Sequence, residues 1–115
     1  MRFRGQNASS EMISLISPNL KIILFDVNNW LKERGHEMTI TSMIRPQSGD
    51  SGVHAAKRAF DISIKGIENL AQELCDYVNK KYVYGNGKKT AILNDGGNYA
   101  GQGIANHIHF QVPKF

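Results

Sequence analysis

The chain has 115 residues and a mass of 12.8 kDa, enough for one compact domain and too little for two, so we expect a single domain over residues 1–115. Hydrophobic residues make up 41% and charged residues 21% of the chain, which excludes a disordered or collagen-like protein. The formal charge of +4 favours anionic partners, and both bacterial cell walls and nucleic acids are anionic.

Several other classes of protein are disfavoured by single features of the sequence. Cys75 is the only cysteine, so the chain can form neither an internal disulfide nor a multi-thiolate zinc site. The longest apolar run, residues 22–25, is far shorter than the roughly 20 residues of a membrane span. The N-terminus lacks the apolar stretch of a secretory signal peptide, and the scattered basic residues form no recognised nucleic-acid motif. We therefore expect no signal peptide, no membrane partner and no nucleic-acid partner.

Two segments have the apolar spacing of amphipathic helices. Ser17-Pro18 is typical of a helix start, and apolar residues at intervals of three and four predict a helix over residues 18–34, ended by Gly35. The same spacing predicts a second helix over residues 67–81, with Cys75 on its buried side as a core residue rather than a nucleophile. Asp26 falls between the apolar positions of the first helix, so we expect it to be exposed.

Four segments are predicted to be strands: residues 37–44, 59–64, 90–93 and 107–112. In the first of these, partial alternation places Met38, Ile40, Ser42 and Ile44 on one face. Residues 46–53 and 94–106 are rich in turn-forming residues and are predicted to be loops. The order of helices and strands predicts an α+β fold, with a small antiparallel sheet flanked by helices.

His107 and His109 are the most suggestive pair of residues in the chain. Side chains two residues apart on a strand point to the same face, about 6.6 Å apart along the strand, so one metal ion could contact both. Catalytic zinc sites use three ligands drawn from His, Asp and Glu and keep a fourth position for water. Taken alone, however, such a pair is more often a solvated strand face than a metal site.

A second motif lies upstream of the histidine pair. Residues 51–62, Ser-Gly-Val-His-Ala-Ala-Lys-Arg-Ala-Phe-Asp-Ile, resemble the S-x-H-x-x-G-x-A-x-D segment of the zinc peptidases that include D-Ala-D-Ala carboxypeptidases, D-Ala-D-Ala dipeptidases and phage L-alanyl-D-glutamate endopeptidases. His54, Ala59 and Asp61 match this pattern at the family's spacing. His107-Ile108-His109 is similar to the H-x-H that ends the site in relatives such as lysostaphin-type endopeptidases and the Hedgehog signalling domain. The resemblance spans residues 38–112, with gaps.

The resemblance implies a Hedgehog/DD-peptidase fold with a Zn²⁺ ion held by His54, Asp61 and His109. It also implies that His107 lies beside the metal-bound water as a catalytic residue. Residues 41–45, Thr-Ser-Met-Ile-Arg, are similar to the strand that ends in the family's substrate-binding arginine. Arg45 is therefore implied to be catalytic and substrate-binding, and its forked donors suit a carboxylate or an oxyanion. Ser51 is the other implied substrate-binding residue.

The implied function is that of a small phage-type endolysin. Such an enzyme hydrolyses an amide bond in the peptidoglycan stem peptide, and we expect it to be a monomer. It would act from the host cytoplasm with holin-dependent access to the wall, or from the virion. The alternatives are a D-Ala-D-Ala carboxypeptidase or dipeptidase, and a zinc-stabilised binding or virion module without catalysis.

The sequence departs from the family pattern at three positions. Gly52 replaces the usual serine before the first histidine, Lys57 replaces a glycine, and Asn106 replaces the glutamate that serves many members as catalytic base. An asparagine cannot accept a proton, which leaves three readings. His107 is the base, or Asp50 or Asp95 reaches in from a loop, or the site binds zinc without turnover.

Overall fold

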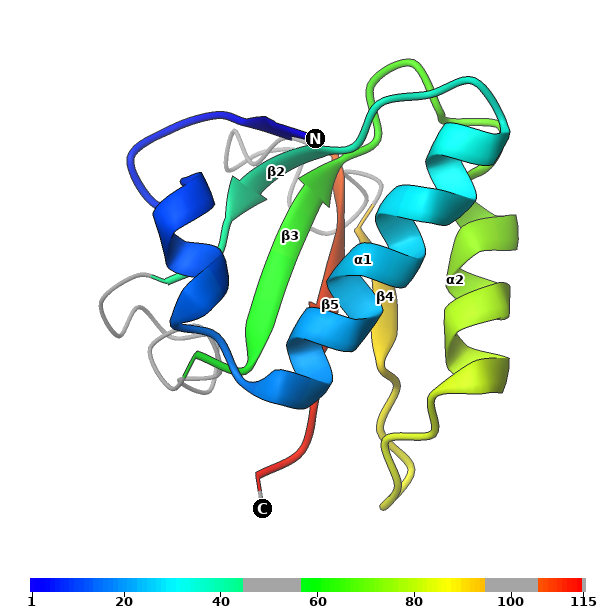
Figure 1. The fold of residues 1–115 in the computed structure, drawn as a ribbon. Coiled ribbons are helices and arrows are strands. Elements are labelled where there is room, and N and C mark those ends of the chain that lie inside the picture. The colour runs from blue at the N-terminus through cyan, green and yellow to red at the C-terminus, as the bar shows by residue number, and fades with distance from the viewer. Residues whose placement is uncertain (45–56, 95–105, 115) are drawn as a thin grey trace.

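A computed structural model of the chain describes residues 1–44, 57–94 and 106–114. It has an α+β fold, as predicted, with two α-helices, one short 3-10 helix and a five-stranded sheet (Figure 1). No helix among these residues is long and apolar enough to cross a membrane. The elements in chain order are β1 (Arg2–Phe3), η1 (Ser10–Ser14), α1 (Pro18–Glu33), β2 (Thr39–Ser42), β3 (Ala59–Ser63), α2 (Ala71–Lys81), β4 (Ala91–Asn94) and β5 (His107–Gln111).

The sheet is mixed rather than wholly antiparallel. Its strand order is β1-β2-β3-β5-β4, and the pairs β2–β3, β3–β5 and β4–β5 are antiparallel, as predicted from the short connections. The prediction was wrong at one edge, where β1 pairs with β2 in parallel through Arg2 and Thr39. A two-residue strand carries no readable alternation, so the sequence offered no sign of it. The last two strands of the chain, β4 and β5, lie side by side; β3 is central, and β5 lies between β3 and the edge strand β4.

The first helix begins and ends close to the predicted residues, and the second ends where predicted but begins later. In α1 the Ser17 hydroxyl accepts a hydrogen bond from the backbone N–H of Leu20 at 3.3 Å, which caps the helix start. Gly35 has a φ of +80° just after the helix, a conformation that glycine adopts without steric cost and that stops the helix. The second helix starts four residues later than predicted, at Ala71, because residues 67–70 form a turn instead.

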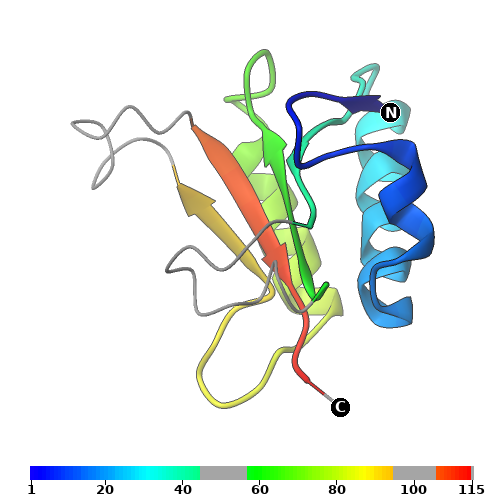
Figure 2. The same ribbon diagram turned by 90° about the vertical axis from the view of Figure 1, so that its left-hand side faces the viewer.

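Both helices pack on one face of the sheet, as Figures 1 and 2 show. Phe60 and Phe110, from neighbouring strands, stack with their ring centroids 4.8 Å apart at the centre of this face. Cys75 lies in the same core, as predicted, and burial raises the pKa of its thiol to about 12. The apolar residues of the helix stripes and sheet that form this core include Leu20, Leu24, Val27, Leu31, Leu74, Val78, Ile40, Ile62 and Ile108. The polar residues of β3 and β5 alternate with this core and point to the other face: Asp61, Ser63, His107, His109 and Gln111.

The strand β2 is irregular at a point that matters for that polar face. Ile40 pairs with Ile62, and regular pairing would then set Ser42 opposite Phe60, but Ser42 pairs with Asp61. The register therefore shifts between Ile40 and Ser42, as in a β-bulge, which re-aims the side chains that follow. The burial of β2 still alternates as predicted, with Ile40 and Ser42 buried and Thr39 and Thr41 half-buried, but the backbone register does not continue regularly. Ser42 lies beside Asp61 instead.

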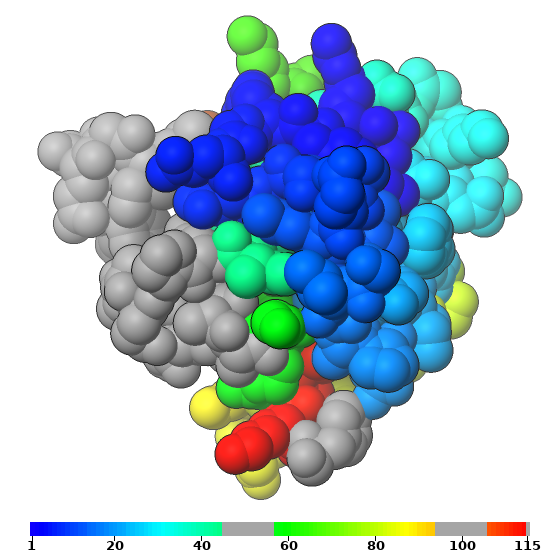
Figure 3. All heavy atoms as spheres, turned by 60° about the vertical axis from the view of Figure 1, so that its left-hand side comes forward, coloured from blue at the N-terminus to red at the C-terminus, as the bar shows by residue number. Residues whose placement is uncertain are grey.

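The N-terminal segment covers one edge of the sheet. The 3-10 helix η1 was not predicted, and together with the residues before it η1 forms the surface beside β2 (Figure 3). Backbone N–H groups of Arg2 and Arg4 donate to the carbonyls of Met38 and Ile40, at 2.8 and 2.9 Å. This pairing satisfies backbone groups of β2 that would otherwise lie at an open edge.

Asp26 on α1 was predicted to be exposed, but its side chain is partly buried. Its side chain is only 16% exposed because Tyr77 and Tyr82 donate hydrogen bonds to it and Lys81 forms an ion pair with it at 2.8 Å. Burial by itself raises the pKa of Asp26, but the ammonium of Lys81 and the hydroxyls of Tyr82 and Tyr77 outweigh this effect and lower it. The cluster ties α1 to α2 and to the residue after α2.

Candidate metal centre

Two of the three predicted zinc ligands meet on the polar face of the sheet. Asp61 on β3 and His109 on β5 are directly opposite each other in the antiparallel register. Opposed residues of paired strands point to the same face. Ile108 and Phe110 flank His109 along β5 and are fully buried against the helices, so His109 points away from them. The alternation that predicted this face from the sequence is confirmed.

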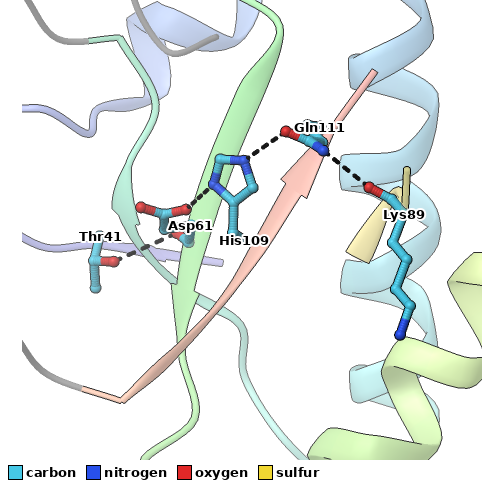
Figure 4. Close-up of polar contacts among 5 residues, drawn as sticks. All are labelled: Thr41, Asp61, Lys89, His109 and Gln111. Carbon is cyan, nitrogen blue, oxygen red and sulfur yellow. Dashed lines mark hydrogen bonds and ion pairs between the residues drawn. The ribbon is translucent and has the colours of Figure 1, made fainter. Parts of the chain in front are cut away.

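The two side chains point toward each other at hydrogen-bond distance (Figure 4). Asp61 Oδ1 lies 2.8 Å from His109 Nδ1, and the side chains are only 9% and 13% exposed. A carboxylate oxygen and an imidazole nitrogen attract at this distance only when a proton or a metal cation lies between or beside them, because both atoms otherwise present lone pairs. The pair therefore suits a hydrogen on Nδ1 or a metal cation between the two atoms, in a place where little water can screen the interaction.

His107 lies on the same face as His109, two residues before it along β5. It is opposite Ser63, with the buried Ile108 between the two histidines in sequence. The predicted convergence of His107 and His109 on one face is thus confirmed. The pairing also separates their positions: Asp61 is opposite His109, not His107, which agrees with the division in which His109 is the ligand.

The residues present suit a zinc ion in chemistry and nearly in spacing. One carboxylate and neutral imidazoles are ordinary zinc ligands, and no described cysteine lies near them. Two donors bound tetrahedrally at about 2.0–2.1 Å from zinc are about 3.3 Å apart. The observed separation of 2.8 Å between Oδ1 and Nδ1 would therefore have to widen by about half an ångström. Rotation of either side chain gives such a change.

The third predicted ligand, His54, lies outside the described residues. So do Arg45 and Ser51, the predicted substrate-binding residues, and Asp50 and Asp95, the alternative bases. Among residues 1–44, 57–94 and 106–114, no group of three His, Cys, Asp or Glu side chains is close enough to hold a metal ion. The described part of the site is therefore a pair of predicted ligands, and the complete ligand set stays a prediction.

Asn106, the residue that replaces the family's glutamate, is described and exposed. It immediately precedes β5, three residues before His109. An amide at this position cannot take a proton from water, so the described residue on this face that has the chemistry of a general base is His107.

The sequence reasoning missed Gln111, which contacts the second nitrogen of the His109 ring. Its Oε1 lies 3.1 Å from His109 Nε2, and its amide nitrogen donates to the backbone carbonyl of Lys89 at 3.0 Å (Figure 4). A signal was available, since Gln111 is two residues beyond His109 and hence on the same strand face. On the other side of the pair, the Thr41 hydroxyl reaches the Asp61 backbone carbonyl at 3.5 Å.

Comparisons of the chain with protein-family models, with curated proteins and with solved structures found no match. The resemblance to zinc peptidases is therefore carried by the short sequence motifs alone.

Proposed function

We propose that the chain is a zinc-dependent peptidase that hydrolyses an amide bond in the peptidoglycan stem peptide. The observation that carries the proposal is the pairing of Asp61 and His109, which are 48 residues apart in sequence and 2.8 Å apart at their side chains. These are two of the three residues that the motif resemblance singles out as ligands. Nothing in helix or strand periodicity requires them to meet, so their meeting is independent support.

Each residue has a separate task in the proposed reaction. When bound, zinc would supply Lewis acidity that polarises the scissile carbonyl and acidifies water. Asp61, His109 and the predicted His54 would hold the ion, and their single negative charge would leave the site net positive. His107, on the same face and outside the Asp61–His109 pair, would accept the proton from the attacking water. Arg45 would hold a substrate carboxylate or the developing oxyanion.

The proposal is tested by metal content and hydrolysis in a matched set of histidine variants. We expect the wild-type chain to bind one zinc ion and to release new amino termini from purified peptidoglycan. His109→Ala should abolish both properties, whereas His107→Ala should keep zinc and lose about 10²- to 10⁴-fold in rate, the usual contribution of a general base. The matched control is His36→Ala, since His36 lies just past the end of α1 and off the sheet face. Absence of zinc from the wild-type protein would overturn the proposal.

The products of the same digestion identify the bond. Mass spectrometry that finds free D-alanine or a D-alanyl dipeptide would favour the carboxypeptidase or dipeptidase. New internal amino termini in the stem peptide would favour the endopeptidase. These outcomes also decide between an enzyme with a closed pocket and one with an open groove.

A second candidate function is favoured by Asn106, which is exposed next to β5 where a catalytic glutamate is usual in the resembled family. In this reading the chain binds zinc for stability and serves as a binding or virion module. It predicts one zinc ion per chain, a lower melting temperature after zinc removal and no new amino termini in any peptidoglycan digest. The His107→Ala variant would then match the wild type in every assay.

A further inference from the structure

Both ring nitrogens of His109 have side-chain partners among the described residues. Nδ1 faces Asp61 Oδ1 at 2.8 Å, and Nε2 faces Gln111 Oε1 at 3.1 Å. The amide of Gln111 continues the chain of contacts to the backbone carbonyl of Lys89, at 3.0 Å (Figure 4). The ring is thus held from both ends, by a carboxylate on one side and an amide on the other.

The Lys89 carbonyl, at the end of this series of contacts, determines the direction of both hydrogen bonds of the Gln111 side chain. The Lys89 carbonyl can only accept, so the end of the Gln111 amide that faces it must be the NH₂ group. The other end of the amide, which faces His109, is then the oxygen, and an oxygen can only accept. Nε2 of His109 must therefore carry a hydrogen, whichever state the rest of the ring adopts.

The backbone reinforces this arrangement. The N–H of Gln111 donates to the carbonyl of Thr90 at 2.9 Å, one residue along from the Lys89 carbonyl that its side chain binds. Gln111 therefore joins β5 to the residues before β4 through both its backbone and its side chain. An amide anchored in this way cannot turn over without setting its oxygen against the oxygen of Lys89.

We propose that Gln111 is a positioning residue that keeps the hydrogen of His109 on Nε2 and so presents Nδ1, the nitrogen beside Asp61, to the metal ion. This inference rests on the proposed zinc function. Ligating histidines commonly donate their second ring N–H to an oxygen, which fixes the ring and raises its basicity, and loss of such a partner costs about 10- to 100-fold in metal affinity. Here the oxygen belongs to an amide whose orientation is set by a backbone carbonyl.

The test uses two variants that share one loss and differ in the other. Gln111→Glu and Gln111→Met both remove the hydrogen bond to Lys89, but only Gln111→Glu keeps an acceptor for His109 Nε2. A residue that merely tied β5 to Lys89 would give both variants the same zinc affinity. We expect Gln111→Met to bind zinc about 10- to 100-fold more weakly than the wild type, and Gln111→Glu to bind it within a few-fold of the wild type or more tightly. Circular dichroism of each variant checks that it is folded.

A second measurement on the metal-free protein separates this inference from the proposed function. Long-range ¹H–¹⁵N correlations of the histidine rings should show a hydrogen on Nε2 of His109 in the wild type and in Gln111→Glu. In Gln111→Met the hydrogen on Nε2 should be lost, because that nitrogen has lost its acceptor, and the ring should carry its hydrogen on Nδ1, where the Asp61 carboxylate accepts it. A wild-type His109 without a hydrogen on Nε2, or equal zinc affinities for the two variants, would overturn the positioning role. A wild type that keeps this hydrogen yet binds no zinc would overturn the proposed function alone.

Discussion

The Asp26 cluster allows the effect of one substitution to be worked out from the structure. Asp26→Asn keeps an oxygen for Tyr77, whose hydroxyl donates at 2.9 Å, but it sets an NH₂ group where Tyr82 and Lys81 now contact a carboxylate. Breaking a hydrogen bond to a charged acceptor costs about 1.5–3 kcal/mol. The ion pair adds little to this cost, because Lys81 is 51% exposed and solvent screens it. The expected loss of stability is about 2–3 kcal/mol at neutral pH.

The pH dependence of this loss follows from the lowered pKa of Asp26. A carboxyl whose pKa is lower in the folded than in the unfolded state stabilises the protein above its ordinary pKa of 3.8, and this contribution disappears as the pH falls through the folded-state value. The difference between wild type and Asp26→Asn should therefore be largest at pH 7 and should shrink below about pH 4.

Urea unfolding followed by circular dichroism at pH 7 and at low pH measures both effects. At pH 7 the thermal midpoint should also fall by about 8–12 °C for a domain of this size. Asp76→Asn is a matched control, because Asp76 is exposed on α2 and bonds only to Gln72 among the contacts described for it. A variant as stable as the wild type at pH 7, or a loss that persists unchanged in acid, would refute the reasoning.

Three further predictions concern the metal, the core and the polar face. In a thermal melt, zinc at about 1,000 times its dissociation constant should stabilise the wild type by about 4 kcal/mol, and EDTA should reverse this stabilisation. His109→Ala should show neither effect. Phe60→Ala removes a fully buried ring that stacks on Phe110 and should cost about 3–5 kcal/mol in urea unfolding; a loss below 1 kcal/mol would contradict the packing. Ser42→Ala should be neutral or slightly stabilising in the same assay, because the buried Ser42 hydroxyl has no hydrogen-bond partner among the described residues; a marked loss of stability would mean that this hydroxyl is bonded.

A fourth measurement concerns Cys75. Its thiol should not react with Ellman's reagent in the folded protein, because burial raises its pKa to about 12 and only the thiolate attacks. Reaction should become rapid in urea. Fast labelling of the native chain would show that the Cys75 side of α2 is not buried against the core.

Local patterns were sufficient to predict most of the helices and strands. The Ser17 cap and the apolar spacing located α1 to within one residue at its C-terminal end, and the alternation of β5 predicted that His107 and His109 share a face. These predictions are correct because a helix or strand buries one side of itself, and one-sided burial produces a periodic pattern of apolar residues along the sequence.

The tertiary structure alone decided which residues meet across the sheet. The parallel strand β1, the register shift that sets Ser42 beside Asp61 and the Tyr77 and Tyr82 contacts that bury Asp26 all join residues far apart in sequence. At the site, the sequence determined which strand face holds the predicted metal-binding side chains. The pairing of β3 with β5 decided that Asp61 faces His109, and the Lys89 carbonyl decided which way Gln111 points. Hydrogen-bond direction depends on the partner at the far end, and no local pattern records that partner.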